Sequence, residues 1–422
     1  MKIKLVLGGI LLVVLGVVSG FYASTSPVVQ TIPEKDSTVE DINFSKLVPV
    51  KTFNLSESKA KNVILLIGDG MSISQITGYR ILKGGPNSRI AMDKFPYTGI
   101  VLTHSHNAPI TDSASSATAY STGSKTNNRY LGMDSDKNYL ENLTEKLDQH
   151  GFVSSLIATS EISHATPAAF VAHVESRWNT DEISSQIFDS NVAVLLGGGR
   201  KIFLPESLGG VRKDNRNLLE EIQSSELLVT TKDELSEFNM DQPGRVFGLF
   251  SDDHLRDIDT PDNHSKEPSL SNMLQFAIDR SVYYQDKGCK GFFIMAEGSQ
   301  VDWAGHVNNL DYLRREMEDL DEAVALALEH AMQSKDTLVI VTADHETGGL
   351  LLESDGIYTK DSIKFSFNTA IGQGNHTGVP VPVYAYGPGA ENFTGTLDNT
   401  DIYRAILASL KLNSSSGSCI KY

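Results

Sequence analysis

The sequence predicts an α/β fold in which a mostly parallel central sheet is flanked by helices on both faces. Short apolar segments rich in β-branched residues recur along the chain without alternating with polar residues, as expected of strands covered on both sides. Longer segments with apolar residues at three- and four-residue spacing lie between several of them. Strands that alternate with helices favour parallel pairing, so we expect one sheet sandwiched by helices.

The predicted strands are apolar runs of four to six residues. They span residues 63–67, 99–103, 153–158, 192–196, 292–295, 337–341 and 381–386. Helices are predicted over residues 140–150, 270–286 and 310–333, the last of which carries an apolar stripe formed by Leu313, Met317, Leu320, Val324 and Leu328. The segments 205–245 and 353–375 are more polar, so we expect them to be small peripheral insertions.

The composition is that of a globular chain. Of its 422 residues, 40% are apolar and 21% are charged, which excludes an intrinsically disordered protein. The 36 Lys and Arg against 53 Asp and Glu give a net charge of −17, whereas nucleic-acid binding requires clustered Lys and Arg. We therefore expect a single domain over residues 59–412 and no nucleic-acid partner.

The two ends of the chain differ from this domain. Lys2 and Lys4 precede an apolar run over residues 5–18, and small residues follow, which is typical of a secretory signal in residues 1–23. The run is also long enough for an uncleaved membrane anchor, which is the alternative. Residues 24–58 are predicted to be a flexible spacer and residues 413–422 a flexible tail. We therefore expect an exported protein, either periplasmic or secreted.

Cys289 and Cys419 are the two cysteines of the sequence. Two thiols cannot build a disulfide framework, a four-thiolate zinc site or an iron-sulfur cluster. We expect them to be unpaired, with a bridge between them as the alternative.

Acidic and imidazole side chains collect near the ends of the predicted strands, where ligands bind to parallel α/β sheets. They are Asp69, His164, Glu297, Asp302, His306, Asp344, His345 and His376, with Thr159 and Thr166 among them. So many acids and imidazoles on one edge would repel each other unless cations neutralised them. Nitrogen and oxygen donors without thiolates suit Zn²⁺, and an all-oxygen set suits Mg²⁺. The sequence therefore predicts a metal centre.

A candidate nucleophile lies in residues 111–123 (TDSASSATAYSTG). Asp112 or Ser113 would cap a helix that Gly123 ends, so Ser113 would stand near its first turn. Free amides and the positive end of the helix attract a phosphate there. The alternative is a tightly packed helix of small residues without chemistry.

Several motifs resemble those of the alkaline phosphatases and appear in the same order as in that family. They are residues 62–71 (NVILLIGDGM), 111–123, 164–169 (HATPAA), 173–177 (HVESR), 196–201 (LGGGRK), 297–302 (EGSQVD), 342–349 (TADHETGG) and 376–378 (HTG). The similarity extends over roughly residues 60 to 410. It implies an alkaline phosphatase-like fold, phosphate monoesters as small-molecule substrates, and a homodimer.

The resemblance also implies a role for each site residue. Ser113 would become phosphorylated and would contact the metal, and Arg177, oriented by Asp112, would grip two phosphate oxygens. The first zinc would be held by Asp302, His306 and His376. The second would be held by Asp69, Asp344 and His345. The third ion, usually Mg²⁺, would be held by Asp69, Thr166 and Glu297.

Two positions depart from the best-known bacterial pattern. His164 stands where some members have Asp, and Trp303 stands where some have Lys. An imidazole in place of a carboxylate weakens the attraction for Mg²⁺ at the third site and would let zinc enter. Trp303 removes a cation near the phosphate, so we expect weaker retention of phosphate and faster product release than in a lysine-containing enzyme.

The implied mechanism agrees with the chemistry of the residues. A serine hydroxyl is a poor nucleophile at neutral pH, and no histidine relay is apparent, so a metal must lower its pKa. Two zinc ions would flank an in-line displacement of the ester oxygen. The alternatives are a related metal-dependent phosphodiesterase or sulfatase and a non-catalytic protein that binds metal or phosphate.

Overall fold

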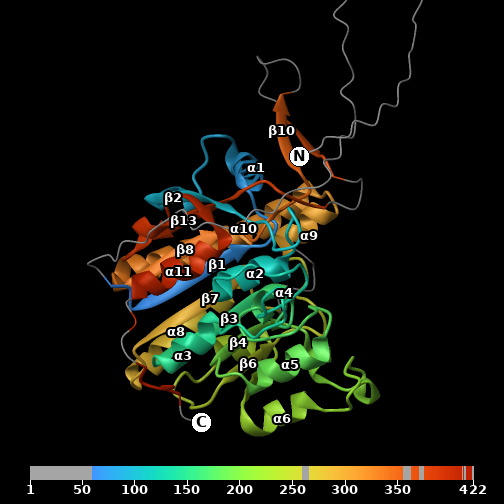
Figure 1. The fold of residues 1–422 in the computed structure, drawn as a ribbon, viewed down its shortest axis with the longest axis vertical. Helices are drawn as coiled ribbons and strands as arrows, with labels where there is room; N and C mark the ends of the chain where they lie inside the picture. The colour runs from blue at the N-terminus through green and yellow to red at the C-terminus, as the bar shows by residue number, and fades with distance from the viewer. Residues whose placement is uncertain are drawn as a thin grey trace, which may run out of the picture. The chain divides into compact units, whose positions relative to one another are not determined.

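A sheet of ten strands forms the centre of the computed structural model, in the order β14-β2-β13-β8-β1-β7-β3-β4-β6-β5 (Figure 1). Its strands are β1 (Asn62–Gly68), β2 (Tyr97–Leu102), β3 (Phe152–Glu161), β4 (Val194–Gly198), β5 (Leu227–Val229), β6 (Val246–Leu249), β7 (Gly291–Gly298), β8 (Thr337–Thr342), β13 (Val381–Tyr386) and β14 (Gly395–Asp398). The strands from β8 to β5 in this order are parallel, whereas β13 is antiparallel to both β8 and β2. With helices on both sides, this confirms the predicted fold class.

The structure describes residues 59–258, 266–354, 363–369, 375–410, 412 and 415–420. The predicted secretory signal or anchor in residues 1–23 and the predicted spacer over residues 24–58 lie outside the described residues. Within the described ranges, no helix combines the length and the apolarity that a membrane crossing requires. The described residues all belong to one compact unit.

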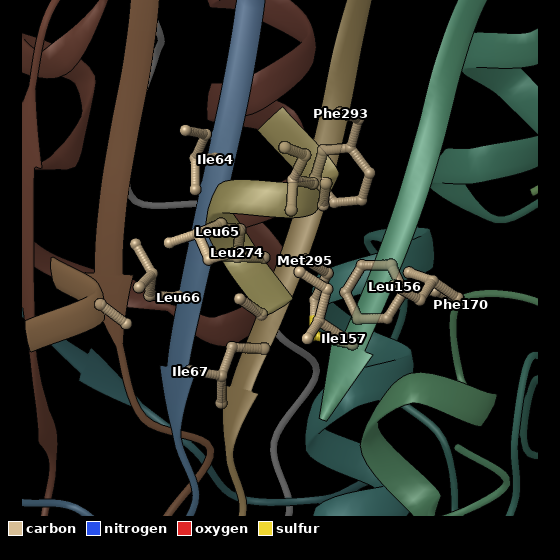
Figure 2. Packing of buried hydrophobic residues seen from close by; sticks show 14 of the residues in the cluster. Ile64, Leu65, Leu66, Ile67, Leu156, Ile157, Phe170, Leu274, Phe293 and Met295 are labelled. Carbon is tan, nitrogen blue, oxygen red and sulfur yellow. The ribbon is translucent and has the colours of Figure 1, made fainter. Parts of the chain in front are cut away.

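The central strands are apolar on both faces because both faces are covered. Every residue of β1 is buried, and its Leu65 pairs with Met295 of β7 on one side and with Ile340 of β8 on the other. Figure 2 shows side chains from β1, β7 and β3 packed together with Leu274 and Phe170. Burial on both faces explains why these runs do not alternate in the sequence.

The helices are α1 (Ile73–Gly84), α2 (Ser113–Thr122), α3 (Leu143–Gln149), α4 (Ala165–Ala168), α5 (Thr180–Asp189), α6 (Leu218–Ser225), α7 (Lys232–Ser236), α8 (Leu270–Asp286), α9 (Gln300–His306), α10 (Leu310–Ser334) and α11 (Asn399–Leu410). One group comprises α10 with its neighbours α1, α8 and α9, and another comprises α2 with α3, α4 and α11. The predicted stripe of α10, from Leu313 to Leu328, is buried. The predicted helix over residues 270–286 has the observed bounds of α8.

The outer parts of the sheet differ from the prediction. In β2, near one edge, Val101 is buried and the other five residues are not, so this strand is not covered on both faces as predicted. The segment 205–245, predicted to be a peripheral insertion, contributes β5 to the opposite edge. The other polar segment, 353–375, contains the end of β10 (Leu350–Ser354) and all of β11 (Ile363–Phe367), and these two strands pair antiparallel. A separate short pair joins β9 (Glu346–Thr347) to β12 (His376–Thr377).

The structure corrects the expectation of two unpaired thiols, because Cys289 and Cys419 form a disulfide. They are 130 residues apart in the chain, but their Cα atoms are 5.2 Å apart, within the normal range for a bridge. Sequence spacing could not reveal that the chain end returns to the start of β7. The backbone amides of Ser416 and Gly417 also donate to the carbonyl oxygen of Gln149, so the described part of the tail is more fixed than its composition predicts.

Candidate active site

The carboxyl ends of four adjacent parallel strands bring the predicted metal ligands together. In the order β8-β1-β7-β3, these strands lead to Asp344, Asp69, Glu297 and His164. Figure 1 shows α2, α4 and α9 beside this end of the sheet. Asp69 is followed by Gly70, at which a Cβ atom would lie 2.7 Å from the Cα atom of Asp302, so this close approach requires glycine.

Three groups of these side chains have ligand atoms within 4.8 Å of one another. The first consists of Asp302, His306 and His376, the second of Asp69, Asp344 and His345, and the third of Asp69, His164 and Glu297. The first two groups contain the same residues that the sequence suggested for two zinc sites. The third contains His164 as well as the predicted Asp69 and Glu297. Thr166, the remaining predicted ligand, is buried on α4.

The acids at this edge of the sheet are buried, and some of their oxygens lack a hydrogen-bond partner. One carboxylate oxygen each of Asp69, Glu297 and Asp344 is buried and has no hydrogen-bond partner among the described residues. Burial raises the pKa of Asp344 to about 6 and that of Glu297 to about 7. Burial, followed by the charges of neighbouring acids, raises the pKa of Asp69 well above its usual value. Orphaned oxygens beside imidazoles are the donor set that divalent cations prefer, so these residues fit the implied metals.

Ser113 lies at the start of α2, directly beside the second group. Asp112 caps this helix by accepting from the backbone N–H of Ser115 at 3.0 Å, and Gly123 ends it with a φ of 72°. The Ser113 Oγ atom is 3.3 Å from His345 Nε2 and 3.4 Å from Asp69 Oδ2. The nucleophile predicted from the sequence therefore faces two of the predicted metal ligands.

Arg177 is held in the site by two contacts. Its Nη1 lies 3.4 Å from Asp112 Oδ2, the contact that the resemblance suggested. Its Nη2 donates to His164 Nε2 at 3.0 Å, which the sequence did not suggest. Burial, followed by the charge of Arg177, lowers the pKa of His164 well below its usual value, so this ring is a neutral acceptor. The guanidinium is thus tied to both the nucleophile helix and the third group.

Trp303 packs in an aromatic cluster with His164 and His254. Its ring centroid is 6.2 Å from that of His164 and 4.5 Å from that of His254. The Nδ1 atom of His254 accepts from the backbone N–H of Glu161 at 3.1 Å. Sequence reasoning missed His254, although it follows β6 at the same edge of the sheet, because that strand was not predicted.

A second missed residue is Thr347 of β9, which is buried. Its hydroxyl donates to Asp302 Oδ1 and lies 3.2 Å from His345 Nδ1. Nothing in the local sequence distinguishes it from other threonines, because its two partners come together only in the folded chain.

Comparison with known proteins gives consistent results. The family model described as "Alkaline phosphatase" matches residues 60–366 and 355–412. Alkaline phosphatase 4 of Bacillus subtilis is 37% identical over 430 residues, covering 84% of this chain and 90% of that protein. The solved alkaline phosphatase from the Antarctic bacterium TAB5 is 35% identical with a TM-score of 0.75, covering 85% of this chain and 100% of its own. A variant of that enzyme with glutamate in place of a histidine, solved with Mg bound in its M3 site, is 34% identical with a TM-score of 0.73, covering 86% and 100%.

Proposed function

Because the chain belongs to the alkaline phosphatase family, it hydrolyses phosphate monoesters, and we propose that Ser113 is the nucleophile of this reaction. The family confirms the predicted monoesterase over the diesterase, sulfatase and non-catalytic alternatives. The observation that carries the proposal is the position of Ser113 on the first turn of α2, 3.3 Å from His345 Nε2 and 3.4 Å from Asp69 Oδ2.

We propose that three cations occupy the site. Zinc ions would be held by the group containing Asp302 and by the group containing His345, and a magnesium ion by Asp69, Glu297 and Thr166, with His164 beside it. The buried carboxylate oxygens without partners support this assignment. When bound, the ions would lower the pKa of the Ser113 hydroxyl and offset charge on the phosphate.

In the proposed reaction, Ser113 Oγ forms a bond to phosphorus while the bond from phosphorus to the ester oxygen breaks. The Ser113 hydroxyl loses its proton, and the departing ester oxygen gains one to leave as the alcohol. Water then attacks phosphoserine, releasing inorganic phosphate and restoring Ser113. Arg177, fixed by Asp112 and His164, would hold two non-bridging oxygens through its paired N–H groups.

The covalent step can be tested by trapping it. The metal-loaded full chain and its Ser113→Ala variant are incubated with a ³²P-labelled monoester and quenched in acid. We expect label on the peptide containing Ser113 in the parent chain and none in the variant. Ser121→Ala is the matched control, since Ser121 is also buried on α2 but its hydroxyl donates to the Ala169 carbonyl oxygen. Label that persists in Ser113→Ala would contradict the proposal.

We also propose that the chain is exported and forms a homodimer. The disulfide between Cys289 and Cys419 supports export, because such bonds persist in oxidising compartments. Fractionation of the producing cells, with sequencing of the mature amino terminus, would test export and distinguish a cleaved signal from an anchor. The family resemblance supports the dimer, which light scattering on the purified chain would test.

A further inference from the structure

Thr347 lies between two of the candidate metal groups and contacts a member of each. Its hydroxyl donates to Oδ1 of Asp302, which belongs to the first group. The same hydroxyl oxygen is 3.2 Å from Nδ1 of His345, which belongs to the second group. One buried hydroxyl thus joins ligands of two different ions.

The direction of these bonds follows from the number of protons available. A carboxylate that binds a metal is ionised, so Asp302 can only accept a hydrogen bond. The single hydroxyl hydrogen of Thr347 is used in that bond. The remaining lone pairs of its oxygen can only accept, so the partner atom, Nδ1 of His345, must carry the ring proton.

This proton placement decides which nitrogen of His345 is free. A neutral imidazole carries one proton, so with Nδ1 protonated the lone pair is on Nε2. Nε2 lies 3.2 Å from an oxygen of Asp344 and 3.4 Å from an oxygen of Asp69, the other members of its group. It is therefore the nitrogen that an ion held by these acids would need.

The backbone of Thr347 is fixed on both sides. Its N–H donates to the Gly70 carbonyl oxygen at 3.2 Å, and its carbonyl oxygen accepts from the Gln75 side chain at 3.0 Å. The same amide of Gln75 donates to Glu346 at 2.8 Å, and Glu346 also accepts from the hydroxyl of Thr377, next to the ligand His376. The backbone of Thr347 is therefore held in place relative to Gly70, which follows Asp69, and relative to Thr377, which follows His376.

We propose that Thr347 is a positioning residue that holds Asp302 in place and fixes His345 with Nε2 free, so that it couples the two zinc sites. This inference rests on the zinc sites proposed above. It goes beyond them because it predicts that one hydroxyl controls the affinity of both.

The test compares zinc binding by Thr347→Val, which keeps the side-chain shape but lacks the hydroxyl, with Thr347→Ser, which keeps the hydroxyl. The full chain is stripped of metal and titrated with zinc against a competing chelator. We expect Thr347→Val to bind both ions about 10- to 100-fold more weakly, the usual effect of losing a partner of a metal ligand. Thr347→Ser should retain most of the affinity. Thr144→Val is the control, because Thr144 is buried on α3 and donates to the Phe170 carbonyl oxygen away from the site.

A second readout follows the ring proton directly. In the metal-free chain, ¹⁵N spectra of the histidine side chains should show His345 protonated at Nδ1, and Thr347→Val should show a mixture of tautomers. If Thr347→Val does not fold, Thr347→Ala takes its place, since it also lacks the hydroxyl. Parent and hydroxyl-free chains that bind zinc equally tightly would overturn this inference alone. A parent chain that takes up no zinc would overturn the proposed sites and this inference together.

Discussion

The acids at the carboxyl edge of the sheet and the acid pair on α10 are both buried, but they are neutralised differently. Glu316 and Asp319 of α10 accept backbone N–H groups from Ile258 and Leu270, at 3.2 and 3.1 Å. Among the described residues, neither belongs to a group with metal-ligand geometry. Burial raises the pKa of Glu316 to about 8 and that of Asp319 to about 6, so at neutral pH a proton neutralises Glu316, the more strongly shifted of the two.

The edge acids can instead be neutralised by metal ions, because histidines lie among them at distances that suit shared ligation. Asp302 illustrates the difference. Burial raises its pKa, but the hydrogen bond from His306 and the charges of His376 and His345 outweigh that effect and lower it. Burial alone therefore does not identify a metal site, whereas burial together with interleaved imidazoles does. The comparison can be tested by adding or removing charge in each region.

The largest effect should follow removal of an acid that two of the metal groups share. Asp69→Asn should lower turnover at least about 100-fold, since a metal ion supplies several kcal/mol of charge stabilisation. The same change should make the metal-free chain more stable at pH 8, because burial and the neighbouring acids disfavour the ionised form of Asp69, and asparagine has no such form. Turnover and thermal unfolding of the metal-free chain are the measurements. A metal-free variant less stable than the parent would show that the edge acids do not repel one another.

Adding an acid at the edge should strengthen the binding of a metal ion there. His164→Asp should tighten Mg²⁺ binding by about tenfold, because a carboxylate is a better ligand than imidazole for this ion. It should also replace the imidazole that accepts from Arg177 Nη2 with a shorter carboxylate acceptor. Calorimetric titration of the zinc-loaded chain with Mg²⁺ measures the affinity, and His254→Asp, outside the three metal groups, is the control. Equal Mg²⁺ affinity in parent and variant would exclude His164 from the third site.

Adding a positively charged side chain at position 303 should have a smaller effect, which we expect on the affinity for phosphate. Trp303→Lys should tighten inhibition by inorganic phosphate several-fold and slow product release, because it adds a positive charge close to the proposed phosphate position. Inhibition constants and pre-steady-state kinetics measure these quantities, and Trp303→Phe separates the added charge from the loss of the indole. Unchanged inhibition by phosphate would contradict the role given to this position.

The smallest effect is expected on α10, and on stability alone. The pKa of Glu316 is raised on folding, from an ordinary 4.5 to about 8, so the unfolded chain binds fewer protons between these values and stability falls as pH rises through them. Glu316→Gln should remove this fall and leave the chain more stable than the parent at pH 9, without changing turnover, since each unit of the pKa shift is worth about 1.4 kcal/mol. Thermal unfolding at pH 5 and pH 9 provides the comparison. A variant as sensitive to alkaline pH as the parent would show that this acid is ionised when folded.

Periodicity predicted the central part of the fold well. A short, continuous apolar run such as residues 63–67 is typical of a strand whose two faces are both covered. The helix α10 shows an apolar stripe because its other side faces solvent. The edges were harder to predict. The short β5 lies in a polar segment, and β2 has one covered residue, so neither carries the pattern of a buried strand.

For the site, residue type and the resemblance to the alkaline phosphatases named side chains that the structure brings close to one another. Ser113, Arg177 and the acids and histidines of the first two groups were all named from the sequence and lie together in the structure. Residues that only their position in the fold brings to the site were missed. Thr347 and His254 are ordinary residue types, and the bond between Cys289 and Cys419 depends on where the chain end returns.

The central claim is that divalent ions neutralise the edge acids and activate Ser113. It is tested most directly by stripping the purified full chain of metal and measuring monoester hydrolysis as zinc is returned in known equivalents, with magnesium present. We predict no turnover without metal and full recovery at two zinc ions per chain. Hydrolysis by the metal-free chain at the rate of the loaded enzyme would contradict the account.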